Sequence, residues 1–104
     1  MGTWLYRIEP AREGMPDAPT PAEMTLVGQH FAYLQAAYAA GTARWVARTE
    51  TAPHLGLAVV ECADRVAAEA FLAGDPAVAA GVFRGQIQPL KEVLGSVSGS
   101  GNPK

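Results

Sequence analysis

The sequence contains a single cysteine, Cys62, so the chain cannot form an internal disulfide bond. No second cysteine or histidine lies beside it at the spacing of metal ligands, and we predict no metal site. Cys62 follows a β-forming run, residues 55–61, and nothing near it in the sequence would lower the pKa of its thiol. We therefore expect a small buried side chain in a reducing compartment, not a nucleophile.

An excess of positive charge is also missing. Eight Lys and Arg stand against ten Asp and Glu, and the formal net charge is -2. Without a basic stripe the chain lacks the electrostatic footprint of nucleic-acid binding, so we expect no nucleic-acid partner. The apolar runs are too short to cross a bilayer, and no basic segment followed by an apolar run opens the chain. We expect a soluble, cytoplasmic protein with no membrane partner.

The motifs of common cofactor-dependent enzymes are absent as well. There is no glycine-rich phosphate loop, no Ser-His-Asp order and no zinc-ligand spacing, and we expect no cofactor. The 104 residues suffice for one domain with one core. We assign this domain to residues 1–94 and expect residues 95–104, rich in Gly and Ser, to form a flexible tail.

The first half of the chain predicts a strand and a long helix. Residues 3–9 alternate Trp4, Tyr6 and Ile8 on one side with more polar residues on the other, which predicts a strand that ends at Pro10. Residues 10–20 carry further prolines and no periodicity, and they predict a mobile connection of the kind that often covers a site as a lid.

The helix begins at Thr20, because TPAE at residues 20–23 combines a capping hydroxyl, a proline at the first helical position and a glutamate that can bond back to the cap. It ends at Gly41. Its apolar residues recur in steps of three and four. This spacing predicts a buried face made of Met24, Val27, Phe31, Leu34 and Tyr38.

The second half predicts two further strands, a helix and a last strand. Residues 43–48 and 55–61 indicate a hairpin around a turn with His54 exposed, and residues 82–90 indicate the last strand. Asp64 caps a helix that ends at Gly74. The inward positions of that helix are predicted as Val66, Ala67, Ala70 and Phe71. The order βαββαβ predicts an α+β, ferredoxin-like fold, with both helices on one face of a four-stranded antiparallel sheet.

The other face of this sheet is left uncovered. Its composition is too polar for a core and too apolar for plain surface, so we predict a homodimer in which two sheets close face to face into a dimeric α+β barrel. The arginines of this face then either bind ligand in a cavity or bridge the subunits, and the sequence leaves both open. We assign to this face Leu5, Arg7, Glu9, Arg44, Val46, Arg48, Val82, Arg84, Gln86 and Gln88.

His30 lies at the edge of the predicted apolar face of the long helix, and Tyr33 shares its flank. The two helices are neighbours on the sheet, so Asp75, just past the second helix, can approach His30 and orient its ring. Each residue also has a structural interpretation: a half-buried His bonded to a backbone carbonyl, and an Asp that bonds its own backbone in an Asp-Pro turn. Position alone leaves both interpretations open.

Three stretches carry a further signal: HFAYL at residues 30–34, GDPAVAAGVF at residues 74–83 and IQPL at residues 87–90. Over residues 4–94 the chain resembles the YCII-related (YciI-like) family, although its connection at residues 10–20 is longer than in the shortest members. The resemblance implies a ferredoxin-like subunit in a dimeric α+β barrel related to muconolactone isomerase. It also implies an acid–base pair at His30 and Asp75, and in some members small cyclic, halogenated or lactone-like substrates.

Two functions follow from these observations. The first is a cofactor-free acid–base enzyme of lyase or isomerase type that acts on a small cyclic or anionic metabolite, with His30 moving a proton and Asp75 holding its tautomer. The predicted substrate-binding residues are Arg7, Arg44, Arg84 and Tyr33. The alternative is a non-catalytic dimer that binds a small molecule or serves as an accessory subunit, with a purely structural His30–Asp75 bond. An imidazole nitrogen open to a pocket would favour the enzyme.

Overall fold

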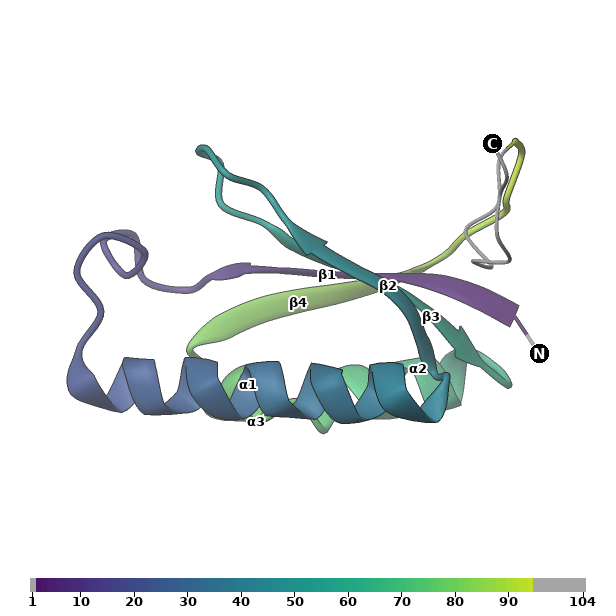
Figure 1. Cartoon of the computed structure of the whole chain (residues 1–104), viewed down its shortest axis with the longest axis horizontal. Coiled ribbons are helices and arrows are strands. Elements are labelled where there is room, and N and C mark those ends of the chain that lie inside the picture. Colours follow the sequence, from purple (N-terminus) through teal and green to yellow (C-terminus); the bar gives the residue numbers. More distant parts are fainter. Residues whose placement is uncertain (1, 95–104) are drawn as a thin grey trace.

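The computed structural model describes residues 2–94, and in this range a four-stranded sheet packs against helices on one side (Figure 1). The strands are β1 (Gly2–Pro10), β2 (Ala43–Arg48), β3 (Gly56–Cys62) and β4 (Phe83–Pro89), and the helices are α1 (Pro21–Ala40), α2 (Arg65–Ala73) and α3 (Pro76–Ala79). All pairings are antiparallel in the order β2-β3-β1-β4. The predicted α+β, ferredoxin-like arrangement is confirmed.

The central strand β1 supplies the middle of the core. Trp4, Tyr6 and Ile8 are each at most 9% exposed and face the helices, because alternate residues of a strand point to the same side. Leu5 and Arg7 lie on the other side, which the helices leave bare (Figure 1). We call these two sides the covered face and the open face of the sheet.

β2 departs from the predicted alternation. Its pairing with β3 is irregular just after Ala43, where Arg44 is an extra residue. A bulge of this kind reverses the side on which every later residue of the strand points. Val46 and Arg48 therefore lie on the covered face, and their assignment to the open face is wrong. Trp45 takes a place on the open face instead.

α1 begins and ends where the sequence predicts. Glu23 donates its N–H to the Thr20 hydroxyl at 3.1 Å, and the Glu23 carboxylate accepts the N–H of Thr20 at 2.9 Å. The two bonds complete the capping box. Gly41 ends the helix with a φ of 87°, a left-handed conformation that a residue without a Cβ adopts readily.

The side of α1 that meets the sheet agrees with the predicted one only in part, because Leu34 is buried as predicted and Val27 is half-buried. His30 and Leu34 are its buried residues, whereas Met24, Phe31 and Tyr38 are 60%, 58% and 62% exposed. The prediction that these three residues are buried is wrong. α1 carries apolar residues around most of its circumference, so the period of the sequence does not identify the side that packs.

α2 is also turned relative to its prediction. Val66 is 77% exposed and Ala70 is exposed, so both inward assignments are wrong. Ala68 is fully buried, and Ala67 and Phe71 pack against the core as predicted. Leu72, which was not among the predicted inward residues, also packs against the core, and its side chain lies against Gly85 of β4.

Residues 11–20 connect β1 to α1 at one end of the sheet (Figure 1). The Arg12 guanidinium donates to both carboxylate oxygens of Glu23, at 2.9 Å and 2.7 Å, and to the carbonyl of Ala18 at 2.9 Å. This hydrogen bonding lowers the pKa of Glu23 from its ordinary 4.5 to about 2. Met15 is buried. The predicted mobility of the connection stays a prediction.

Two predictions concern features outside this core. The expected tail, residues 95–104, lies outside the described residues. Within residues 2–94, no helix has both the length and the apolar character that crossing a membrane requires.

Candidate functional site

α1 and the junction between α2 and α3 bring His30 and Asp75 together. Nδ1 of His30 lies 2.6 Å from Oδ2 of Asp75, which is the N-cap residue of α3. Asp75 is fully buried and His30 is only 9% exposed. The predicted contact between the two residues is confirmed, although His30 is buried more deeply than its position at the edge of the apolar stripe indicates.

Asp75 is the centre of a closed hydrogen-bond network. Its Oδ1 accepts the N–H of Ala77 at 2.9 Å, which caps α3. Its Oδ2 accepts the hydroxyl of Tyr6 in addition to the contact with His30. Asp75 therefore bonds its own backbone through Oδ1, as the structural interpretation predicts, and contacts His30 through Oδ2.

Tyr6 is a member of this network that sequence reasoning missed. It lies on β1, is fully buried, and sits in the alternation of the core aromatic residues. Nothing in that pattern distinguishes a tyrosine with a hydrogen-bonding task from one that only fills space. Burial, followed by the hydrogen bond to Asp75, raises the pKa of Tyr6 well above its usual range, so its hydroxyl remains a donor.

The charge of Asp75 decides where the hydrogen of His30 sits. Burial alone raises the pKa of the Asp75 carboxyl, but the hydrogen bonds from His30 and Tyr6 outweigh burial, and the net shift is downward. An ionised carboxylate only accepts hydrogen bonds. Nδ1 of His30 therefore carries a hydrogen, and in the neutral ring Nε2 keeps a lone pair.

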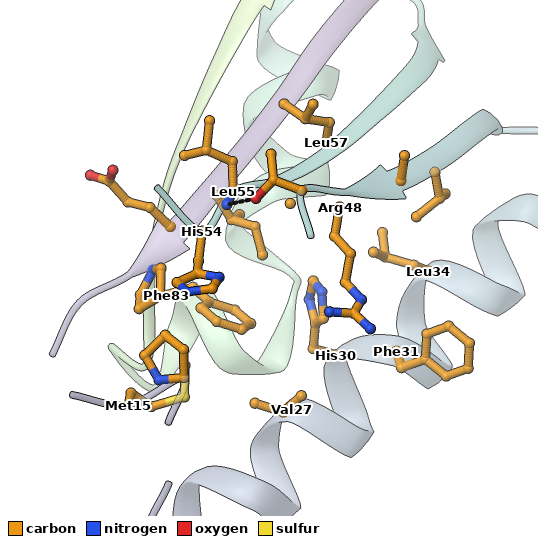
Figure 2. A pocket seen from close by; sticks show the side chains of 18 of the residues that line it. Met15, Val27, His30, Phe31, Leu34, Arg48, His54, Leu55, Leu57 and Phe83 are labelled. Atoms are coloured by element: carbon orange, nitrogen blue, oxygen red, sulfur yellow. Dashed lines mark hydrogen bonds between the residues drawn. The ribbon is translucent and has the colours of Figure 1, made fainter. Parts of the chain in front are cut away.

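A cavity of about 780 Å³ lies beside His30, between α1 and the end of the sheet (Figure 2). Its walls are mostly apolar, with Met15, Val27, Phe31 and Phe83 among them. The ring of His30 packs edge-on against Phe83, with the ring centres 5.0 Å apart. Nε2 of His30 has no hydrogen-bond partner among residues 2–94, and the side chain lines the cavity. The size is typical of small-molecule sites.

Two further polar residues of this cavity are Arg48, at the end of β2, and His54, in the turn before β3 (Figure 2). His54 is exposed, as predicted, but its exposed side chain faces the cavity. Sequence reasoning placed Arg48 on the wrong face because a bulge leaves no mark in the alternation of so short a strand. The bulge is the reason that Arg48 and His30 share a cavity.

The four residues predicted to bind substrate do not line this cavity. Arg7 and Arg84 lie on the open face, and Arg44 lies at the bulge of β2. Their role as substrate ligands stays a prediction. Each of the four makes a contact within the chain: Arg7 with Gln86 at 2.7 Å, Arg44 with Glu61 at 3.5 Å, Arg84 with Glu9 at 3.5 Å, and the Tyr33 hydroxyl with the carbonyl of Phe71 at 2.8 Å.

Cys62 and the possible metal ligands add no chemistry to this site. Cys62 is 7% exposed, and burial, with smaller effects of Glu61 and Asp64, raises the pKa of its thiol. The prediction of a small buried side chain is confirmed. Within the described part of the chain, no three His, Cys, Asp or Glu side chains gather in a way that could hold a metal ion.

Comparison with known proteins yields one finding. A family model described as the YCII-related domain matches residues 8–97, a range that contains most of the sheet, all three helices and both members of the His30–Asp75 pair. The comparison with curated protein sequences finds no match.

Proposed function

The chain belongs to the YCII-related family. Because the family domain contains the His30–Asp75 pair, we propose that the protein is a cofactor-free acid–base enzyme of lyase or isomerase type. Its substrate is a small cyclic or anionic metabolite. The observation that supports the proposal best is the asymmetry of the imidazole: Nδ1 is bonded to a buried carboxylate, while Nε2 has no partner among residues 2–94 and its ring lines a cavity.

The chemistry follows from this asymmetry. Nε2 of the neutral His30 ring takes a proton from a carbon next to a carbonyl, and the electron pair of that C–H bond moves onto the carbonyl oxygen. Asp75 holds the tautomer and stabilises the positive charge that forms on the ring. His30 then returns the proton to another carbon in an isomerisation, or a neighbouring substituent leaves with the electron pair in an elimination.

A test that needs no known substrate is proton exchange in heavy water. A panel of lactones and of ketones with a hydrogen beside the carbonyl is incubated with the protein, and deuterium incorporation is followed by NMR. We expect the parent protein to accelerate exchange in at least one compound. The exchange rate with His30→Ala should be about 10²- to 10⁴-fold lower than with the parent.

The matched control is Gln29→Ala, which shortens an exposed neighbour of His30 on the same helix. We expect this variant to exchange at the parental rate. The proposal fails if folded His30→Ala exchanges protons as fast as the parent. It fails equally if no compound that binds in the cavity undergoes exchange.

Binding in the cavity without proton exchange would favour the alternative function, a non-catalytic dimer that binds a small molecule or serves as an accessory subunit. One observation supports it: Asp75 caps α3 and bonds Tyr6, so its carboxylate has a structural task whether or not His30 transfers protons. Binding without proton exchange is the result expected of that function.

The proposed assembly is a homodimer formed through the open face. Leu5 and Leu57 are half-buried there, and Trp45 is 45% exposed. A second copy of the face would cover these apolar side chains with an interface of roughly 800 Å² per partner. The cavity beside His30 is lined mainly by residues of α1, of the covered face and of the connection between β1 and α1, and Leu57 of the open face also lines it.

A further inference from the structure

Arg48 differs from the other arginines of residues 2–94. It makes no hydrogen bond or ion pair with any residue in this range, and it is exposed at the end of β2. A guanidinium carries five donors in a planar fork that matches a carboxylate. Partners within the chain occupy the other five: Arg7 bonds Gln86, Arg12 bonds Glu23, Arg44 pairs with Glu61, Arg65 with Glu69 and Arg84 with Glu9.

The surroundings of Arg48 favour a negative ligand. The side chain extends from β2 into the cavity, on the side from which His30 and Phe31 project from α1 (Figure 2). Glu9 is the carboxylate among the lining residues, and it already pairs with Arg84 at 3.5 Å. The cavity therefore offers one unmatched positive charge within walls that are otherwise mainly apolar.

We propose that Arg48 is the anion-binding residue of this cavity, and that the cavity takes small organic carboxylates with an apolar body. The carboxylate bonds the guanidinium of Arg48, and the body packs against Val27, Phe31 and Phe83. Since Arg48 and His30 enter the cavity from β2 and α1, a ligand held by Arg48 extends toward His30 (Figure 2). The assignment of organic carboxylates as the substrate class rests on the proposed function. The assignment of Arg48 as a binding residue does not.

The test uses benzoate and benzyl alcohol, which share an aromatic body and differ in charge. Both are titrated into the ¹⁵N-labelled full chain, and dissociation constants are obtained from amide chemical shifts. We expect benzoate to shift the amides around Arg48, and Arg48→Gln to weaken its binding about tenfold or more, because the charge-assisted bond is lost. Arg48→Lys keeps the charge without the fork and should recover part of the affinity.

The matched control is Arg65→Gln, which removes the same charge from an arginine on α2 that does not line the cavity. Its benzoate affinity should equal that of the parent, and benzyl alcohol should bind the parent and Arg48→Gln equally. The inference is overturned if Arg48→Gln leaves benzoate binding unchanged, if Arg65→Gln weakens it as much, or if the parent does not bind benzoate in the millimolar range. Benzoate does not react, so these results are independent of proton transfer by His30.

Discussion

The polar side chains on the two faces of the sheet differ in burial and in how they are hydrogen-bonded. On the covered face, Tyr6, His30 and Asp75 form one buried network around a single carboxylate. On the open face, the polar residues form separate pairs that solvent reaches. Two such pairs are Arg7 with Gln86 and Arg84 with Glu9.

This difference indicates where chemistry can be located. Exposed ion pairs contribute only about 0–1 kcal/mol, and solvent screens their charges. A carboxylate buried beside an imidazole acts more strongly on its neighbour, because less solvent screens it. The covered face therefore combines a directional charge with a cavity, whereas the arginines of the open face are already matched by the chain itself.

The largest effect is expected when the buried carboxylate is neutralised. Asp75→Asn would place an amide NH₂ or a weaker acceptor against two donors, those of Tyr6 and His30. Each hydrogen bond to a charged group contributes about 1.5–3 kcal/mol, and both bonds to the Asp75 carboxylate are weakened, so we expect urea-induced unfolding to show a loss of about 3–5 kcal/mol in the free energy of unfolding.

Asp64→Asn is the control for this variant. Asp64 caps α2 with a bond to the N–H of Ala67 at 2.9 Å, as Asp75 caps α3, but it is exposed. Since Asn is an equally good cap, we expect the free energy of unfolding to change by no more than about 0.5 kcal/mol.

The pKa of Asp75 is lowered, so its contribution to stability is present above the ordinary value of 3.8 and is lost as the pH falls. If Asp64→Asn and Asp75→Asn lose equal free energy of unfolding, the buried network contributes no more to stability than an exposed helix cap.

A smaller effect is expected from Tyr6→Phe, which removes one donor to Asp75 and changes little in volume. The expected loss is about 1.5–3 kcal/mol, the range for hydrogen bonds to charged groups. The pKa of Tyr6 is raised, so its contribution is present below the ordinary value of 10.0 and declines as the pH rises above it.

Unfolding of the parent and of Tyr6→Phe between pH 9 and 11 measures this directly. The difference in unfolding free energy between the two proteins should shrink above pH 10, by up to about 1.4 kcal/mol per pH unit. A difference that stays constant across this range would mean that Tyr6 does not need its proton in the folded protein.

The smallest effect on the protomer, and the sharpest test of the open face, is expected from Leu5→Glu. Leu5 is half-buried on that face, and a charge there opposes contact with a second sheet. Light scattering at micromolar concentration should give about twice the chain mass for the parent and one chain mass for the variant, with the circular dichroism spectrum unchanged. Ala36→Glu, exposed on α1, should remain dimeric. A monomeric parent would rule out the homodimer.

The parts of the site that could be predicted are those that depend on a local turn signal or on the order of the elements. The Asp-Pro junction indicates a turn, and the βαββαβ order makes the two helices neighbours on one face of the sheet, so that Asp75 can approach His30. The network could not be predicted in full, because the hydroxyl of Tyr6 reaches Asp75 only through the packing of β1 under the helices. Arg48 could not be predicted either, because its side depends on the bulge at Arg44.

The sequence by itself determined the order of the four strands and the two longer helices and the caps at Thr20 and Gly41, and it placed Asp75 within reach of His30. These features depend on neighbours in the chain or on the topology of a common fold. Only the tertiary structure decided which sides of α1 and α2 are buried and which face Arg48 lies on. Helices with apolar residues on several sides pack several ways with similar burial, and one extra strand residue reverses a face, so long-range packing makes the choice.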